Sequence, residues 1–342
     1  MNTVADLGPL APTGGVYHGG DLAAARAAFP GAPEPWLDLS TGINPNAYPL
    51  PPLSPDVWTR LPDRARLTRL ERIAAARYGA SAGADIVAAP GAQALIQLLA
   101  RLRRVTSVGI LGFTYGEYEQ IWRAAGAEVH VVETLAALGG FDIAVVVNPN
   151  NPDGRLIAPE ALATLAAGIA HRGGLVVVDE AFMDPLPAGA SLAPILGDAT
   201  IVLRSFGKMY GLAGVRLGFA IAEPKLSETL RALLGPWAVS GPAIEVGSVA
   251  LADDAWLAAA IADLTHRAAA LDRLLVRHGF KVVGGAPLFR LAAHSNAGAL
   301  SEALSRRGVL VRRFPARPEL LRFGLPADDA AFARLDAALT PA

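Results

Sequence analysis

The sequence predicts an α/β protein whose large domain holds a mostly parallel, seven-stranded sheet. Short, almost entirely apolar runs recur along the first two thirds of the chain, and segments with helical spacing of apolar residues separate them. Such runs are typical of strands buried on both faces of a parallel sheet. The expected strands are 86–89, 108–111, 129–132, 143–147, 175–178, 201–203 and 215–221, and helices between them include 94–102, 118–125 and 159–170.

After residue 236 the pattern changes to a smaller α+β unit. A long helical stretch at 242–278, interrupted near Asp253-Asp254, precedes strands at 281–283, 288–291, 309–312 and 320–325 and helices at 297–307 and 328–339. Residues 1–35 are rich in Pro and Gly, with one helical piece that Asp21 is expected to cap. We expect an N-terminal arm (1–35) that joins the small domain, a large domain (36–235) and a small C-terminal domain (236–342).

The composition excludes several classes of function. The chain of 342 residues is 52% hydrophobic with a net charge of −1 and no basic block, which argues against nucleic acid or a membrane surface as partner. It contains no Cys, so thiolate catalysis and Cys-ligated metal are excluded, and no metal is expected. Neither a signal peptide nor a membrane-spanning apolar stretch is evident, so we expect a cytoplasmic protein.

The stretch from Ser205 to Arg216 is the first candidate for chemistry. Only three residues of the chain are Lys, and one of them, Lys208, lies on a Gly-rich loop between two apolar runs. Burial lowers the pKa of an ammonium group, and a neutral amine can condense with an aldehyde. Ser205 and Arg216 could converge on a phosphate. A solvated loop lysine is the alternative that Lys208 alone leaves open.

This stretch, Ser-x-x-Lys followed by Gly-Leu-Ala-Gly-x-Arg-x-Gly, resembles the cofactor-lysine motif of fold type I pyridoxal-phosphate (PLP) enzymes, the class I/II aminotransferase superfamily. The resemblance implies that the large domain binds pyridoxal 5'-phosphate. It implies further that Lys208 binds the cofactor covalently, while Ser205 and Arg216 hold the cofactor phosphate. Members of this superfamily also lead us to expect a homodimer.

Two polar segments at strand ends resemble other motifs of the same family. Asn151, in the run Asn-Pro-Asn-Asn-Pro-Asp-Gly, is implied to donate to the ring hydroxyl oxygen of the cofactor. Asp179 is implied to stabilise the protonated pyridine nitrogen, without which PLP is a poor electron sink. Phe182 stands where relatives often carry a Tyr that contacts the ring oxygen of the cofactor. The hydrogen bond from that Tyr should therefore be missing here. Without the resemblance, a surface turn and a helix cap would explain these residues equally well.

A strand, a Gly-bearing turn and a helix start at residues 86–102 predict an anion site made of backbone N–H groups. By the resemblance, Gly91, Ala92 and Gln93 cradle the cofactor phosphate, although Gln93 departs from the commoner small hydroxyl or acid. Tyr115, in the run Phe-Thr-Tyr-Gly-Glu-Tyr, is implied to stack on the cofactor ring. Ordinary half-buried packing is the alternative for Tyr115.

Arginines in the C-terminal strands are candidates for binding substrate. Arg322 lies inside an apolar strand, and its planar fork suits a carboxylate. It matches the arginine that binds the substrate carboxylate in the family, while Arg312 matches one that contacts phosphate in relatives acting on phosphorylated amino compounds. His18 on the arm could close over that phosphate. Gly42 and Asn151 complete the expected substrate site.

Residues 18–21 (His-Gly-Gly-Asp), the loop 39–45 and residues 179–182 (Asp-Glu-Ala-Phe) together resemble the threonine-phosphate decarboxylases of cobalamin biosynthesis. The resemblance implies decarboxylation of L-threonine O-3-phosphate to (R)-1-aminopropan-2-ol O-phosphate. A histidinol-phosphate-type aminotransferase stays open, and so does an aminotransferase-like ligand-sensing module without turnover. Leu61 replaces a Tyr that reaches the partner subunit's cofactor in many relatives, which puts that shared contact in doubt.

Overall fold

The computed structural model describes residues 18–187 and 189–340, which form two compact units. Unit 1 joins the described residues up to Pro45 to those from Ala262 onward, and unit 2 comprises Asn46–Ile261. The sequence suggested divisions at 35–36 and 235–236, and these domain boundaries stay a prediction. Residues 1–17 of the expected arm, and with them the segment searched for a signal peptide, lie outside the described residues.

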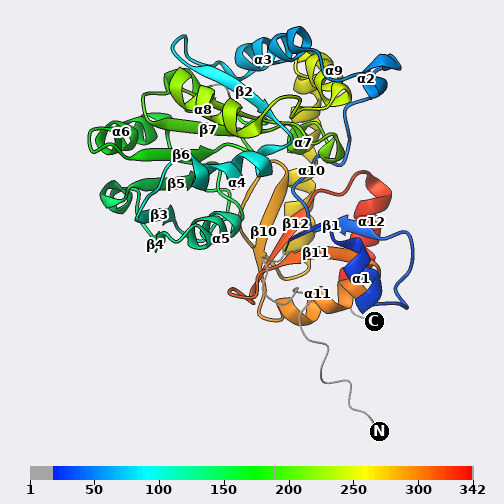
Figure 1. Cartoon of the computed structure of the whole chain (residues 1–342). Helices are drawn as coiled ribbons and strands as arrows, with labels where there is room; N and C mark the ends of the chain where they lie inside the picture. Colours follow the sequence, from blue (N-terminus) through cyan, green and yellow to red (C-terminus); the bar gives the residue numbers. More distant parts are fainter. Residues whose placement is uncertain (1–17, 188, 341–342) are drawn as a thin grey trace. The chain divides into compact units, whose positions relative to one another are not determined.

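Unit 2 is built on a seven-stranded sheet with the order β2-β8-β7-β6-β5-β3-β4 (Figure 1). The strands are β2 (Asp85–Ala89), β3 (Ser107–Leu111), β4 (Glu128–Val132), β5 (Ile143–Val147), β6 (Leu175–Asp179), β7 (Thr200–Ser205) and β8 (Gly218–Ala222). Neighbouring strands are parallel except β8, which is antiparallel to both β2 and β7. The predicted fold class, a mostly parallel seven-stranded sheet in an α/β domain, is confirmed.

The expected start of the last strand was wrong. Residues Ala213–Val215 form a 3-10 turn, and β8 begins only at Gly218. Arg216, which follows the turn, has a φ of 55°, in the left-handed region that a strand cannot contain. The apolar residue Val215 therefore belongs to the loop that carries Arg216, not to the sheet.

Helices cover both faces of this sheet, because side chains on both faces of its strands are apolar. One face packs against α4 (Ala92–Leu102), α5 (Glu117–Ala124) and α8 (Pro224–Leu234) through alternate strand residues such as Val145, Val177 and Leu203. The intervening residues, including Val146 and Val178, are equally buried. The other helices of unit 2 are α2 (Asp56–Thr59), α3 (Arg64–Tyr78), α6 (Pro159–Ala170), α7 (Phe206–Met209) and α9 (Gly241–Ala250).

Unit 1 contains a five-stranded sheet with the order β1-β11-β12-β10-β9. Its strands are β1 (Leu37–Leu39), β9 (Lys281–Ala286), β10 (Phe289–Ala293), β11 (Val309–Arg313) and β12 (Leu320–Gly324), and its helices are α1 (Leu22–Ala28), α11 (Ala297–Arg306) and α12 (Asp329–Leu339). The helix α10 (Asp254–Arg277) crosses the division between the units. Asp21 caps α1 as predicted, since its side chain accepts a hydrogen bond from the backbone N–H of Ala24 at 2.9 Å.

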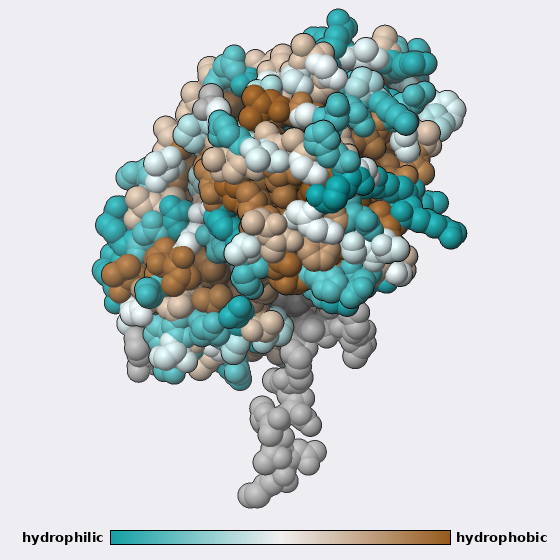
Figure 2. All heavy atoms as spheres, turned by 90° about the vertical axis from the view of Figure 1, so that its left-hand side faces the viewer, coloured by the Kyte–Doolittle hydropathy of each residue, from teal (hydrophilic) through white to brown (hydrophobic). Residues whose placement is uncertain are grey.

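Among the described residues, none of the helices combines the length and the apolar character needed to span a bilayer. On the face shown in Figure 2, hydrophobic residues gather in several separate groups with hydrophilic residues between them. Large apolar side chains that are exposed on unit 2 include Trp58, Leu61, Val131 and Trp237.

Candidate active site

Lys208 lies at the carboxyl end of the sheet of unit 2, on a single helical turn. Strand β7 ends at Ser205, and α7 begins with the next residue and carries Lys208 in its last turn. A Cβ on Gly207 would lie 2.8 Å from the Cα of Ala213, so only a glycine lets the following loop pack this closely against the turn. The side chain of Lys208 is half-buried, with Nζ 5.3 Å from the centroid of the Phe182 ring.

Asp179 is the last residue of the neighbouring strand β6 and is 4% exposed. Its Oδ2 accepts a hydrogen bond from the Tyr118 hydroxyl at 2.8 Å, and its Oδ1 accepts one from the backbone N–H of Ala181 at 2.9 Å. Burial raises the pKa of Asp179 above its ordinary value, whereas Tyr118, Ala181 and the charge of Lys208 lower it. The sheet thus places a buried carboxyl group and the candidate lysine at adjacent strand ends.

A turn at the start of α4 approaches the loop that carries Arg216. Gly91 has a φ of 86°, and a Cβ there would lie 2.6 Å from Nη2 of Arg216. A Cβ on Gly218 would meet the backbone nitrogen of Ala92 at 2.3 Å. The first N–H groups of a helix have no intrahelical partner, so this helix start and the Arg216 guanidinium together form a suitable anion site.

Gln93 is joined to Tyr115 by its side chain. The Tyr115 hydroxyl donates to Gln93 Oε1 at 3.1 Å, and Gln93 Nε2 donates to Glu117 Oε2 at 2.7 Å. The Tyr115 ring stands edge-on to that of Tyr118, with the centroids 6.3 Å apart. The side chain of Gln93 therefore orients the ring expected to stack on the cofactor, and its backbone N–H belongs to the helix start that suits an anion.

The loop that carries Asn151 is held by the buried side chain of Asn150. Asn150 Oδ1 accepts a hydrogen bond from the Thr114 hydroxyl at 2.6 Å, and its Nδ2 donates to the carbonyl of Phe113 at 3.0 Å. These bonds tie the Asn151 loop to the segment that carries Tyr115. Unit 2 therefore gathers the residues expected to bind the cofactor at one edge of its sheet, where ligands of parallel sheets bind.

Unit 1 places the two arginines that are expected to bind substrate opposite each other. Arg312 on β11 and Arg322 on β12 are directly paired in the antiparallel register. Arg322 is 6% exposed, its Nη2 donates to the Ser40 carbonyl at 2.9 Å, and its guanidinium lies 5.0 Å from the centroid of the Phe289 ring. Arg312 is half-buried. Like charges directly opposite in a sheet repel, so this pair favours a bound anion.

Ser40 also joins the arm to this arginine. The backbone N–H of Gly20 donates to the Ser40 hydroxyl at 2.7 Å, and a Cβ on Gly19 would lie 2.3 Å from the Ser40 carbonyl oxygen. The exposed His18 precedes this turn, and the buried Gly42 lies two residues beyond Ser40. Unit 1 therefore brings the His-Gly-Gly turn, the loop with Gly42 and Arg322 close together.

Tyr118, which contacts Asp179 directly, was not among the residues expected from the sequence to form the site. The signal available was a second Tyr three residues after Tyr115, in the first turn of α5. Its partner lies 61 residues away, so the contact itself depended on the tertiary structure.

Comparison with known proteins places the chain in a family. Residues 53–335 match the model of aminotransferase class I and II. A threonine-phosphate decarboxylase of Pseudomonas aeruginosa is 43% identical over 325 residues, covering 94% of this chain and 96% of the relative. A threonine-phosphate decarboxylase of a Sinorhizobium species is 42% identical, covering 95% and 97%. The crystal structure of histidinol-phosphate aminotransferase from Sinorhizobium meliloti in complex with pyridoxal-5'-phosphate has a TM-score of 0.79 and 21% identity, covering 98% and 97%.

The chain therefore belongs to the class I and II aminotransferase family, as the resemblance predicted. Its cofactor is pyridoxal 5'-phosphate. The residues of unit 2 fit that group, because Gly91 lets the Arg216 guanidinium lie against the start of α4, where an anion is favoured, and a buried carboxylate, Asp179, is available for a protonated ring nitrogen.

Proposed function

We propose that this chain is a PLP-dependent lyase that decarboxylates L-threonine O-3-phosphate to (R)-1-aminopropan-2-ol O-phosphate in cobalamin biosynthesis. The observation that carries the proposal is the direct pairing of Arg312 with Arg322, which offers two guanidinium groups to a substrate with two anionic groups. The two threonine-phosphate decarboxylases, at 43% and 42% identity over nearly the whole chain, support the same reaction.

The two arginines have different surroundings, which suits different anions. Arg322 is buried and one of its donors is already taken by the Ser40 carbonyl, so it can present a defined edge to a planar carboxylate. Arg312 is more exposed and lies at the end of β11, where the larger phosphate group has room. His18, in the turn that contacts Ser40, is the further group proposed to contact the phosphate, and Gly42 lies in the neighbouring loop.

Residues of unit 2 hold the cofactor in this proposal. Lys208 binds it covalently, Asp179 holds the proton on its ring nitrogen, and Asn151 donates to its ring hydroxyl oxygen. Tyr115 stacks on the ring. The phosphate group binds to the helix start of Gly91, Ala92 and Gln93 and to the side chains of Ser205 and Arg216. When bound, PLP accepts the electron pair that departing carbon dioxide leaves behind.

The anchoring of the substrate decides between decarboxylation and transamination. Lys208, Asp179 and Asn151 serve both reactions, so they do not discriminate. With the cofactor bound, the orientation of the substrate would select which bond at its α-carbon is cleaved. A phosphate held by Arg312 and His18 would turn the substrate so that the carboxylate is the group lost, whereas a carboxylate held firmly by Arg322 would favour loss of the α-proton.

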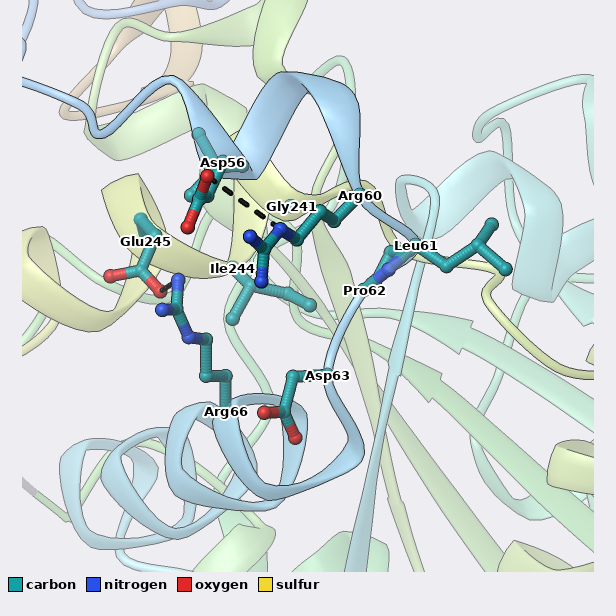
Figure 3. A pocket seen from close by; sticks show the side chains of 10 residues that line it. Asp56, Arg60, Leu61, Pro62, Asp63, Arg66, Gly241, Ile244 and Glu245 are labelled. Carbon is teal, nitrogen blue, oxygen red and sulfur yellow. Dashed lines mark hydrogen bonds and ion pairs between the residues drawn. The ribbon is translucent and has the colours of Figure 1, made fainter.

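A homodimer is part of the proposal, and exposed apolar residues of unit 2 support it. Trp58 and Leu61 are each 67% exposed. Leu61 borders a pocket of about 190 Å³ between α2, α3 and α9, across which Arg66 Nη1 pairs with Glu245 Oε1 at 3.0 Å (Figure 3). Exposed apolar groups beside such a hollow are typical of protein interfaces. Light scattering on the purified protein tests the dimer, and Trp58→Ser should weaken it. A location in the cytoplasm stays a prediction from the sequence.

The deciding experiment incubates purified protein, PLP and threonine phosphate without any keto acid. Stoichiometric carbon dioxide, with the cofactor retained in its aldehyde oxidation state, supports the decarboxylase. Turnover that requires 2-oxoglutarate and yields glutamate would establish a histidinol-phosphate-type aminotransferase instead. Binding of threonine phosphate without any turnover would establish a ligand-sensing module.

A further inference from the structure

Tyr118 is a buried residue at the site to which neither the family resemblance nor the comparisons assign a role. We infer that Tyr118 is a positioning residue, which holds the Asp179 carboxyl group ionised and in one orientation through the hydrogen bond from its hydroxyl to Oδ2. The inference rests on the proposed role of Asp179 toward the cofactor nitrogen and extends it to the contact that maintains it.

Each oxygen of the Asp179 carboxyl group accepts a hydrogen bond from one protein donor. The Tyr118 hydroxyl donates to Oδ2 at 2.8 Å, and the Ala181 N–H donates to Oδ1 at 2.9 Å. An ionised carboxylate has about four acceptor positions, so lone pairs remain for the cofactor N–H. Two donors arriving from different elements also prevent rotation about the Cβ–Cγ bond. The carboxylate is therefore oriented before the cofactor arrives.

The packing around Tyr118 restrains the position of its hydroxyl group. Tyr118 is completely buried in the first turn of α5, among the core residues that include Ile121 and Trp122. The preceding residue, Glu117, accepts hydrogen bonds from Gln93 and Gln97, both on α4. The first turns of α4 and α5 are thus joined, and the phenol ring has little freedom to move away from Asp179.

Electrostatics support the same role. Burial raises the pKa of Asp179, and the Tyr118 hydrogen bond is the strongest of the contacts that lower it, ahead of Ala181 and Lys208. Burial and the neighbouring Asp179 raise the pKa of Tyr118 well above its ordinary value, so its hydroxyl keeps its proton and remains a donor. Of the other charged groups nearby, Glu180 is turned toward Arg204 and Ser191, with 2.8 Å between Arg204 Nη1 and Glu180 Oε2.

Loss of this donor should therefore shift the ionisation of Asp179 toward higher pH. A protonated carboxyl group would be a donor, and it could no longer stabilise a proton on the cofactor nitrogen. Tyr118 then sets how far the pH can fall before the site loses its carboxylate. This is a role that simple packing of the ring would not give, since Phe packs in the same space.

The test compares Tyr118→Phe with Tyr78→Phe in the full chain. Tyr78 is also buried in unit 2, and its hydroxyl has no hydrogen-bond partner among the described residues, so its variant removes the same group without touching Asp179. The PLP affinity of the apoprotein and the pH profile of turnover are measured from about pH 5 to about pH 9. Tyr118→Phe should bind PLP about tenfold more weakly at neutral pH, with the acid limb displaced to higher pH.

Identical PLP titrations and pH profiles for the two variants would overturn the inference. Should Tyr118→Phe not fold, incorporation of fluorotyrosine at position 118 alone provides the second measurement. A more acidic phenol donates more strongly, so the acid limb should then move to lower pH, and an unmoved limb would again contradict the role. PLP affinity is measured without substrate, so this result stands apart from whether the enzyme decarboxylates threonine phosphate.

Discussion

Arg312 and Arg322 lie directly opposite one another across the antiparallel pair of β11 and β12. Directly paired residues of neighbouring strands project from the same face of the sheet, with their Cβ atoms about 5 Å apart. Two like charges in that position repel each other. An anionic ligand bound to both would convert the repulsion into two attractive contacts.

The first prediction concerns the phosphate. Arg312→Ala should raise the apparent KM for threonine phosphate by about ten- to a hundredfold, since a hydrogen bond to a charged group contributes about 1.5–3 kcal/mol. It should hardly change the binding of threonine. The control is Arg313→Ala, because Arg313 pairs with Leu321 and points to the other face of the strand. Equal losses for threonine and threonine phosphate would show that Arg312 does not bind phosphate.

The second prediction identifies the lysine. Lys208→Ala should abolish the visible absorbance of the lysine-bound cofactor and essentially all turnover, because an alanine cannot bind the aldehyde. Borohydride reduction of the wild-type protein, followed by peptide mapping, should label Lys208. The remaining lysines, Lys225 and Lys281, are exposed and serve as internal controls. A label on either of them in place of Lys208 would overturn the assignment.

The third prediction concerns the ring nitrogen. Asp179→Asn should reduce turnover by at least about a hundredfold, since a neutral amide does not stabilise a protonated pyridine in a buried site. The amide preserves the shape of the side chain and can still accept from Tyr118 or Ala181, so the fold should be unaffected. Turnover close to that of the wild type, measured with saturating PLP, would count against this role.

The sequence was sufficient for the inner strands of the sheet because these strands are buried on both faces, so that runs such as 143–147 are apolar throughout. It misplaced the start of β8 because a left-handed residue, Arg216, breaks an otherwise continuous apolar run. The contacts between residues of the site could not be predicted from the sequence. The hydrogen bond from Tyr118 to Asp179 and the pairing of Arg312 with Arg322 depend on helix placement and strand register, which local sequence does not specify.

The last prediction concerns a buried ion cluster that includes Glu180, the residue after Asp179. Arg204 pairs with Glu180 at 2.8 Å and with Asp184, and its guanidinium lies 4.3 Å from the centroid of the Tyr78 ring. The side chains of Arg204 and Glu180 are 5% and 0% exposed. Removing one partner of a buried pair leaves an uncompensated charge, so Arg204→Met should lower the free energy of unfolding by about 3–5 kcal/mol. Urea unfolding measures this.

The loss in the free energy of unfolding of Arg204→Met should also depend on pH, and the burial of Glu180 determines the direction. Burial already raises the pKa of Glu180 above its ordinary value, and Arg204 lowers it. A carboxyl group whose pKa is raised by folding loses stability as the pH rises from its ordinary pKa to the raised one, so the variant should be most destabilised at neutral and alkaline pH and recover as the pH falls. Arg123→Met is the control, because Arg123 pairs with Glu119 at 2.8 Å while its side chain remains 58% exposed, and this change should cost less than about 1 kcal/mol. A loss in Arg204→Met that is no larger than this, or that grows as the pH falls, would show that the cluster does not hold Glu180 as a buried anion.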